Sequence, residues 1–212
     1  MICQNDFLYD KAFTHGGVFH ADDVFAAAML RIIKPGIIIE RGNTVPEDYD
    51  GLVFDIGFGE FDHHQKDKRV RENGVYYAAF GLLWEKYGSM LMNEEDAKAF
   101  DESFVQPIDN SDNTGEKHQL SSIISDFNPV WGDETESFDS MFEKAVDFAK
   151  GILMRKIMHK NANNKAREMV KSLVENTSGN ILIMEKSAPW KEAVKNTDIL
   201  YVVFPSARGG YI

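Results

Sequence analysis

Cysteine and long hydrophobic runs are what this sequence has least of. Its one cysteine, Cys3, excludes an internal disulfide bond and a metal site built from several thiolates. No apolar run approaches the roughly 20 residues of a transmembrane helix, so we expect no membrane partner. The first residues, MICQNDFLYDK, have the pattern of neither a signal peptide nor a mitochondrial presequence. These absences predict a cytoplasmic protein.

Positive charge is also scarce. The chain has 23 Lys and Arg residues against 34 Asp and Glu residues, and its formal net charge is -11. This balance disfavours a protein that reads duplex DNA, because such a protein needs a broad basic face. A small phosphate ester or a single strand held at one site stays open, since bound metal ions neutralise carboxylates locally. The sequence gives no indication of the oligomeric state.

The first half of the chain has the pattern of an α/β fold. Continuous apolar runs of strand length are typical of buried parallel strands, and helical patterns lie between them. The predicted strands are 12–15, 36–40 and 51–57, and the predicted helices are 22–33, 75–87 and 94–104. We therefore expect a mainly parallel sheet flanked by helices. The polar stretch DNSDNTGEKHQ that follows is typical of turns.

The second half changes pattern. Apolar residues recur at helical spacing from Phe138 to Val174, which predicts one long or broken helix that connects two domains. Beyond it, NILIM and DILYVVF are typical of strands and PWKEAVK of a short helix. We expect a first domain over 1–135, a helical connector over 136–176 and the partial start of a second small α/β domain over 177–212. A further strand is expected where the chain ends, so we interpret the sequence as truncated.

Histidines gather near the N-terminus, each close to an aspartate. The segment THGGVFHADD places His15 and His20 just before Asp22, at the start of a predicted helix. A helix cap next to an unrelated histidine is the simpler alternative for this segment. His118 and His159 lie in polar surroundings, and we interpret them as ordinary polar positions.

Two further segments add carboxylates and imidazoles. Asp55 follows the apolar residues GLVF in the segment GLVFDIG, and sites in open α/β sheets lie outside the carboxyl ends of the strands. Asp62, His63 and His64 follow shortly after in FDHH. Asp109, in PIDNSDN, follows an apolar stretch, although this composition is also typical of a turn-rich loop.

Imidazoles and carboxylates without cysteine suit borderline-to-hard divalent ions. Mn²⁺ fits best, with Mg²⁺, Zn²⁺ and Fe²⁺ as competitors. Two ions about 3.5–4 Å apart that share one carboxylate would use this many groups, and such a pair serves in-line displacement at phosphorus. The nearby run QKDKRVRE could attract phosphate, although runs of this kind are usually solvated loops. Its cations are Lys66, Lys68, Arg69 and Arg71.

These motifs together resemble the DHH phosphoesterases, and most closely the MYG1 (UPF0160) group. The similar segments follow one another in order along nearly the whole chain: THGGVFHADD, FDIGFGEFDHHQ, YYAAFGLLWEKYG, FNPVW, APWKEAV and ILYVVFPSARGGY. The resemblance implies a DHH-type metal-binding catalytic domain within residues 1–135. It also implies a metal-dependent exonuclease that shortens single-stranded RNA or short oligonucleotides from the 3′ end.

The resemblance further implies roles for individual residues. One metal ion would be held by His15, His20 and Asp55, and the second by Asp22, Asp55, His63 and Asp109, with Asp55 as the bridge. Asp62 would orient the ring of His63, and His64 would face the substrate phosphate. Asp23 would be a cap or an outer group, and Arg208 would begin a domain that contributes substrate contacts. His20 stands where a carboxylate is common, which strengthens the case for Zn²⁺ or Fe²⁺.

Two other functions stay open at this point. The acidic net charge favours a hydrolase of a small substrate such as pyrophosphate or a nucleotide. A metal-binding regulatory module without turnover is the alternative from another class of protein.

Overall fold

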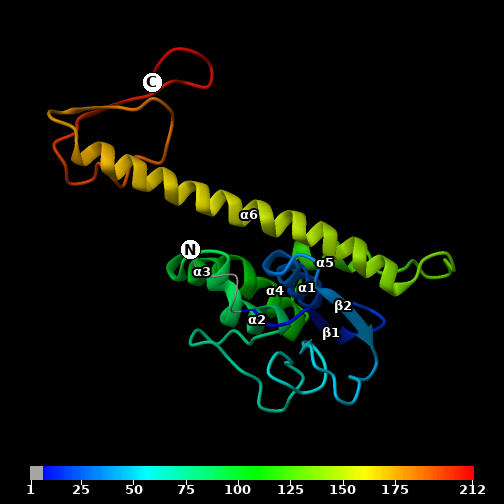
Figure 1. The fold of residues 1–212 in the computed structure, drawn as a ribbon. Helices are drawn as coiled ribbons and strands as arrows, with labels where there is room; N and C mark the ends of the chain where they lie inside the picture. The colour runs from blue at the N-terminus through cyan, green and yellow to red at the C-terminus, as the bar shows by residue number, and fades with distance from the viewer. Residues whose placement is uncertain (1–6) are drawn as a thin grey trace. The chain divides into compact units, whose positions relative to one another are not determined.

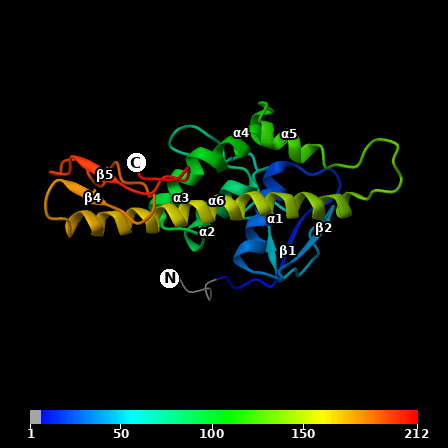
Figure 2. The ribbon, with the colours of Figure 1, turned by 90° about the horizontal axis from the view of Figure 1, so that it is seen from above.

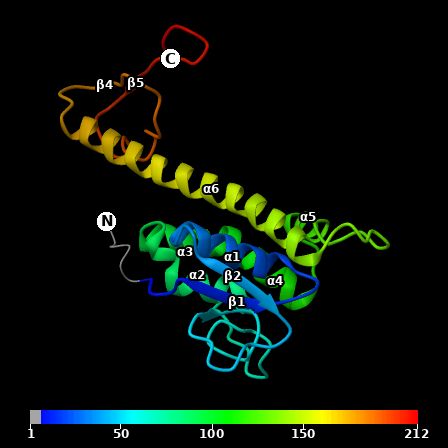
Figure 3. The ribbon, with the colours of Figure 1, turned by 45° about the vertical axis from the view of Figure 1, so that its right-hand side comes forward.

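A small parallel sheet lies in the N-terminal part of the chain, at one side of a group of helices (Figure 1). In the computed structural model, which describes residues 7–212 and so leaves Cys3 outside, the strand order is β2-β1-β3. The strands are β1 (Lys11–His15), β2 (Ile38–Gly42) and β3 (Leu52–Val53). The arrows of β1 and β2 point the same way in Figure 3, and β3 is also parallel to β1. The predicted α/β class with a parallel sheet is confirmed, and the parallel direction brings the carboxyl ends of the strands to one edge.

Helix α1 (Ala21–Ile33) connects β1 to β2 and is buried over most of its length. Its central residues, VFAAAML, are apolar on every face, as expected of a helix with neighbours all round. It packs against α2 (Ala79–Tyr87), α4 (Gln106–Thr114) and α5 (Gln119–Ser125). The first turn of α1 nevertheless contains two fully buried aspartates, and buried carboxylates are costly unless they have partners.

The segment from α3 (Glu94–Phe100) to α4 is helical throughout, so the turn-rich loop considered as the alternative for PIDNSDN is wrong. A wide π-helical turn over Asp101–Val105 separates the two helices. One residue, Gln106, separates this turn from Pro107, which has no backbone N–H to donate and would crowd a regular helical turn. The polar residues of α4 have partners elsewhere in the fold, which is why a turn-like composition forms a helix here.

Helix α6 (Phe138–Glu175) is continuous, which confirms the predicted long helix. The chain divides into two compact units, one up to Arg155 and one from Lys156 to Ile212, so the boundary falls within this helix. The first part of α6 buries Phe142 and Leu153 in the core of the N-terminal unit. The rest of α6 belongs to the C-terminal unit.

In the C-terminal unit, β4 (Ile181–Ile183) and β5 (Tyr201–Val203) form a parallel pair beside the last turns of α6 (Figure 2). These two predicted strands are confirmed. The predicted short helix PWKEAVK is wrong, because residues 191–196 form turns, in which the backbone N–H groups of Lys195 and Thr197 bond to carbonyl groups only three residues back. Among residues 7–212, no helix combines the length and the apolar character needed to cross a membrane.

Candidate metal centre

A cluster of imidazoles and carboxylates lies at the carboxyl edge of the sheet. His15 is the last residue of β1, Asp55 follows β3, and Asp22 lies in the first turn of α1. His63 comes from the loop after β3, and Asp112 comes from α4. This edge is where binding sites form in parallel sheets.

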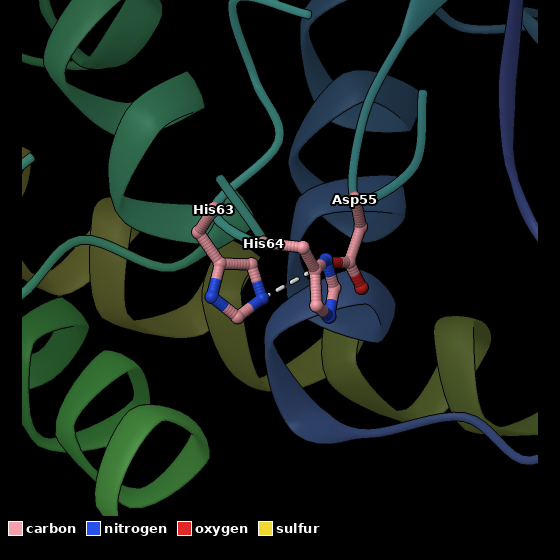
Figure 4. Close-up of side chains that lie close together, drawn as sticks. All are labelled: Asp55, His63 and His64. Atoms are coloured by element: carbon pink, nitrogen blue, oxygen red, sulfur yellow. Dashed lines mark ion pairs between the residues drawn. The ribbon is translucent and has the colours of Figure 1, made fainter. Parts of the chain in front are cut away.

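Asp55 lies at the centre of the cluster. Its backbone has φ of +55°, a left-handed conformation that costs a residue with a side chain about 1–3 kcal/mol. Its Oδ2 lies 3.3 Å from Nε2 of His15, and its Oδ1 lies 3.0 Å from Nε2 of His63. Figure 4 shows the rings of His63 and His64 beside this carboxylate. Burial alone would raise the pKa of Asp55, but the two hydrogen-bonding imidazoles outweigh burial and lower it to about 2.

The first group of possible metal ligands is His15, Asp23 and Asp55. Nε2 of His15 lies 3.1 Å from Oδ2 of Asp23. Burial by itself lowers the pKa of His15, but hydrogen bonds and negative charge from the two aspartates raise it to about 10. The other oxygen of Asp23 accepts the backbone N–H of His20 at 3.0 Å, so Asp23 caps α1.

The second group is His20, Asp22 and Asp112, with His63 beside it. Asp112 lies between the two histidines: Oδ1 is 3.6 Å from Nδ1 of His20, and Oδ2 is 3.3 Å from Nε2 of His63. Nε2 of His63 is also 3.6 Å from Oδ2 of Asp22. The opposite nitrogen of His63, Nδ1, lies 3.4 Å from Oδ1 of Asn113.

Asp109 is part of neither of these groups, nor of the third group, which is Asp55, His63 and His64. Its Oδ2 accepts a hydrogen bond from Nη2 of Arg71 at 2.8 Å, and its Oδ1 accepts the backbone N–H of Gly81 at 3.1 Å. Both oxygens of this fully buried carboxylate are therefore engaged. Asp112, one helical turn further on, reaches the cluster instead. The signal for Asp112 in the sequence is the spacing of three between the two aspartates, which becomes informative only once the segment is known to be helical.

Asp62 contacts a different histidine from the one that the resemblance implies. Its Oδ1 lies 2.7 Å from Nδ1 of His64, while Asn113 holds the ring of His63. Asp62 also accepts the backbone N–H groups of Phe58 at 2.6 Å and of His64 at 3.1 Å. The side chain of His64 is 56% exposed, so this ring is held on one side and open to solvent on the other.

The residues of this cluster fit a divalent cation. Asp22 is fully buried, and its Oδ1 has no hydrogen-bond partner within residues 7–212. Burial raises the pKa of Asp22 well above its ordinary value, and the charges of Asp55 and Asp112 raise it further. Several buried carboxylates with an unsatisfied oxygen, beside imidazoles, form a set of ligands that a Mn²⁺ or Zn²⁺ ion would satisfy.

Two cavities reach the cluster from the surface. One, of about 300 Å³, is lined by His15, His20, Asp55 and His64, with residues 56–58 at its side. The other, of about 620 Å³, is lined by His20 and Asp112 together with the end of α4 and with α5. His20 lines both cavities, so a substrate bound at the cluster has room on two sides.

The predicted phosphate-binding cations have different surroundings. Lys66 is exposed, and Lys68 donates to Oδ1 of Asn113 at 2.9 Å, close to the cluster. Arg69 makes an ion pair with Glu85 at 2.5 Å. Arg71 is buried and donates hydrogen bonds to Asp101 and Asp109 within the fold. Arg208 lies in an exposed turn of the C-terminal unit.

Comparison with known proteins identifies a family for this chain. Residues 11–211 match the MYG1 exonuclease family model, which is described as uncharacterised protein family UPF0160. A MYG1 protein of Saccharomyces cerevisiae is 26% identical over 254 residues, which cover 93% of this chain and 75% of that protein. The MYG1 exonuclease of Homo sapiens is 26% identical over 92% of this chain and 67% of its own length. For the MYG1 exonuclease of Bos taurus the identity is also 26%, over 84% of this chain and 59% of its own length. No solved structure matches.

Proposed function

Because the chain belongs to the MYG1 (UPF0160) family, we propose that it is a divalent-metal-dependent phosphodiesterase that removes nucleotides from the 3′ end of single-stranded RNA or short oligonucleotides. The relatives from Bos taurus and Homo sapiens carry the name MYG1 exonuclease, which supports a nuclease. A cytoplasmic location belongs to the same proposal and rests on the near-absence of cysteine.

One observation carries the metal part of this proposal: the two oxygens of Asp55 face two different imidazoles, His15 at 3.3 Å and His63 at 3.0 Å. A carboxylate placed in this way is suited to bridge two ions. We assign His15, His20 and Asp55 to one ion, as the resemblance implies; the ring of His20, which contacts Asp112, would turn toward this ion. The other ion is assigned to Asp22, Asp55, His63 and Asp112, with Asp112 in the place that the resemblance gives to Asp109.

A bound pair of divalent ions would supply Lewis acidity, which activates water as a nucleophile and neutralises charge at the phosphoryl group. Mn²⁺ is the ion we propose first, and the imidazoles of the first site also suit Zn²⁺ or Fe²⁺. Two outer contacts hold ligands in place: Oδ1 of Asp23 accepts the backbone N–H of His20, and Oδ1 of Asn113 lies 3.4 Å from Nδ1 of His63.

His64 is the residue that we assign to the substrate phosphate. It lines the smaller cavity, and Asp62 accepts the proton on its Nδ1 at 2.7 Å. This contact leaves Nε2 as the atom available to a phosphoryl oxygen. Asp62 acts through His64 as a positioning residue. Lys66, Lys68 and Arg208 remain the proposed contacts to further phosphates, while Arg69 is engaged by Glu85.

A small substrate such as pyrophosphate or a nucleotide is the second candidate. The N-terminal unit supports it, because residues 1–155 contain 14 Lys and Arg against 29 Asp and Glu, a net charge of -15 that opposes long polyanions. A regulatory module that binds metal without turnover would instead show no hydrolysis of any phosphate ester.

Cleavage of a 5′-labelled single-stranded RNA in Mn²⁺ tests the proposal. We expect a ladder of products that shortens from the 3′ end, which disappears in Asp55→Ala and persists in Asp67→Ala, an exposed aspartate of the same loop. Release of phosphate from pyrophosphate, without an RNA ladder, would favour the second candidate. Cleavage that persists in Asp55→Ala would contradict the assigned centre.

A further inference from the structure

Positive charge is concentrated in the C-terminal unit. Residues 156–212 contain nine Lys and Arg against five Asp and Glu, a net charge of +4, in a chain whose overall charge is -11. Such a separation of charge along one chain is typical of proteins whose basic part binds a polyanion.

The same unit contains a cavity of about 460 Å³ between α6 and residues 188–193. Arg167 and Lys171 line it from α6, where a spacing of four residues places them on one face, and Lys191 lines it from the opposite side. Within residues 7–212, none of these three cations makes an ion pair or a side-chain hydrogen bond. The acidic residue of the lining is Glu192, and its Oε2 lies 3.9 Å from Nζ of Lys195. The cavity therefore presents positive charge without an internal partner.

Trp190 gives this cavity an aromatic wall. Its side chain is half-buried and packs against the core of the unit, which consists of Val170, Leu182 and Met184. This packing holds the indole in place while part of it lines the cavity. A fixed aromatic ring beside unpaired cations is the combination with which proteins bind single-stranded nucleic acid: a base stacks on the ring and the phosphates contact the cations.

We propose that this cavity is a binding site for single-stranded nucleic acid, with a base stacked on Trp190 and a neighbouring phosphate at Arg167 and Lys171. An unstacked base is accessible in a single strand but not in a duplex, so the site selects single strands. The inference deepens the proposed function and rests on it for the class of polymer. It gives the acidic chain a place to hold a polyanion.

Fluorescence anisotropy of a short labelled single-stranded RNA, measured in EDTA so that no cleavage occurs, tests the site. We expect the double variant Arg167→Ala/Lys171→Ala to weaken RNA binding at least about tenfold. The number of phosphate contacts obtained from the salt dependence of the affinity should fall by about two. The control is Lys165→Ala/Lys186→Ala, which removes the same charge from exposed positions of the same unit outside the cavity lining. We expect this control to bind within about twofold of the wild type, because its phosphate contacts are intact.

Trp190 is tested separately, because it also contributes to the core. Trp190→Phe keeps an aromatic ring and should retain most of the binding, whereas Trp190→Leu should weaken it about tenfold. Thermal unfolding of both variants shows whether the unit is still folded. If Phe and Leu give equal affinities in folded proteins, there is no stacking and the proposal is wrong.

Other outcomes separate this inference from the proposed function. Equal losses in the two double-charge variants, or binding of anionic vesicles in preference to RNA, would overturn the site. RNA binding that depends on Trp190 and Arg167, with no cleavage in Mn²⁺, would keep the site and refute the activity. Cleavage of a dinucleotide in Mn²⁺, together with an RNA affinity that the cavity variants do not change, would keep the activity and refute the site.

Discussion

At the scale of single residues, two aspartates one helical turn apart have different roles, one structural and one in the metal centre. Asp109 is fully buried, and both of its oxygens accept hydrogen bonds, from Arg71 and from the backbone of Gly81. Asp112 lies 3.3 Å from His63 and 3.6 Å from His20. We infer that Asp109 holds α4 in place so that Asp112 can take part in the metal centre.

The substitution of each aspartate by asparagine separates these duties. Asp112→Asn should weaken Mn²⁺ binding at least about tenfold and leave the free energy of unfolding nearly unchanged. Asp109→Asn should lower the free energy of unfolding by about 1–3 kcal/mol, because it weakens a buried charge-assisted pair, and leave Mn²⁺ affinity nearly unchanged in the folded protein. Calorimetric titration and urea denaturation measure the two quantities. A loss of Mn²⁺ binding in Asp109→Asn equal to that in Asp112→Asn would restore Asp109 as a ligand.

The short motifs of the sequence indicated much of the cluster that the structure brings together. His15, Asp55 and His63 lie within short segments whose strand and loop positions follow from local patterns. Asp112 could not be singled out in this way. Its position depends on α4 being helical and on Arg71 engaging the neighbouring aspartate, and neither is visible in local composition.

At the scale of elements, the close crossing of α2 and α4 depends on Gly81. A Cβ atom at this position would lie 1.8 Å from Oδ2 of Asp109 and 2.5 Å from Nη2 of Arg71. The backbone N–H of Gly81 also donates to Asp109. No side chain fits here, so the contact between the two helices requires glycine.

Gly81→Ala should therefore lower the free energy of unfolding by about 3 kcal/mol and weaken Mn²⁺ binding, because α4 must move away from α2. Gly151→Ala is the matched control: it lies in α6 with open space around its Cβ position and should raise the free energy of unfolding by about 0.5–1 kcal/mol. Urea denaturation of both variants gives the comparison. A neutral Gly81→Ala would show that the crossing has room to relax.

Elements that bury an apolar face were predictable, and elements held by polar tertiary contacts were not. The apolar helix α1 and strand β1 lie within one residue of their predicted bounds. β2 begins two residues later than predicted, and α2 begins four residues later. Residues 106–114 have the composition of turns but form a helix, because Asp109 and Asn113 bond to groups outside it.

At the scale of the whole molecule, folding and metal binding are coupled through buried negative charge. Asp22, Asp23 and Asp55 are buried together at one edge of the sheet, and one oxygen of Asp22 has no partner within the described residues. Burying these carboxylates together without a cation lowers the free energy of unfolding, and a cation that binds the folded protein raises it again.

Two measurements follow from this coupling. Mn²⁺ at about 100 times its dissociation constant should raise the free energy of unfolding of the wild type by about 2.7 kcal/mol. In EDTA, Asp22→Asn should raise the free energy of unfolding by about 1 kcal/mol, because the substitution removes a repelled charge. The further increase that Mn²⁺ gives the wild type should be mostly lost in this variant. Urea denaturation with and without Mn²⁺ measures both. An Asp22→Asn variant that is less stable in EDTA would show that its charge is compensated within the fold.

The central claim is that Asp55 bridges two metal ions, and the most direct test is to count the ions. Metal analysis of the folded chain after loading with Mn²⁺ and gel filtration should give about two ions per wild-type chain and the same for the control Asp67→Ala. Asp55→Ala should retain almost none, because each site loses a shared ligand. Retention of a full ion in folded Asp55→Ala, or a single ion in the wild type, would contradict the bridged centre.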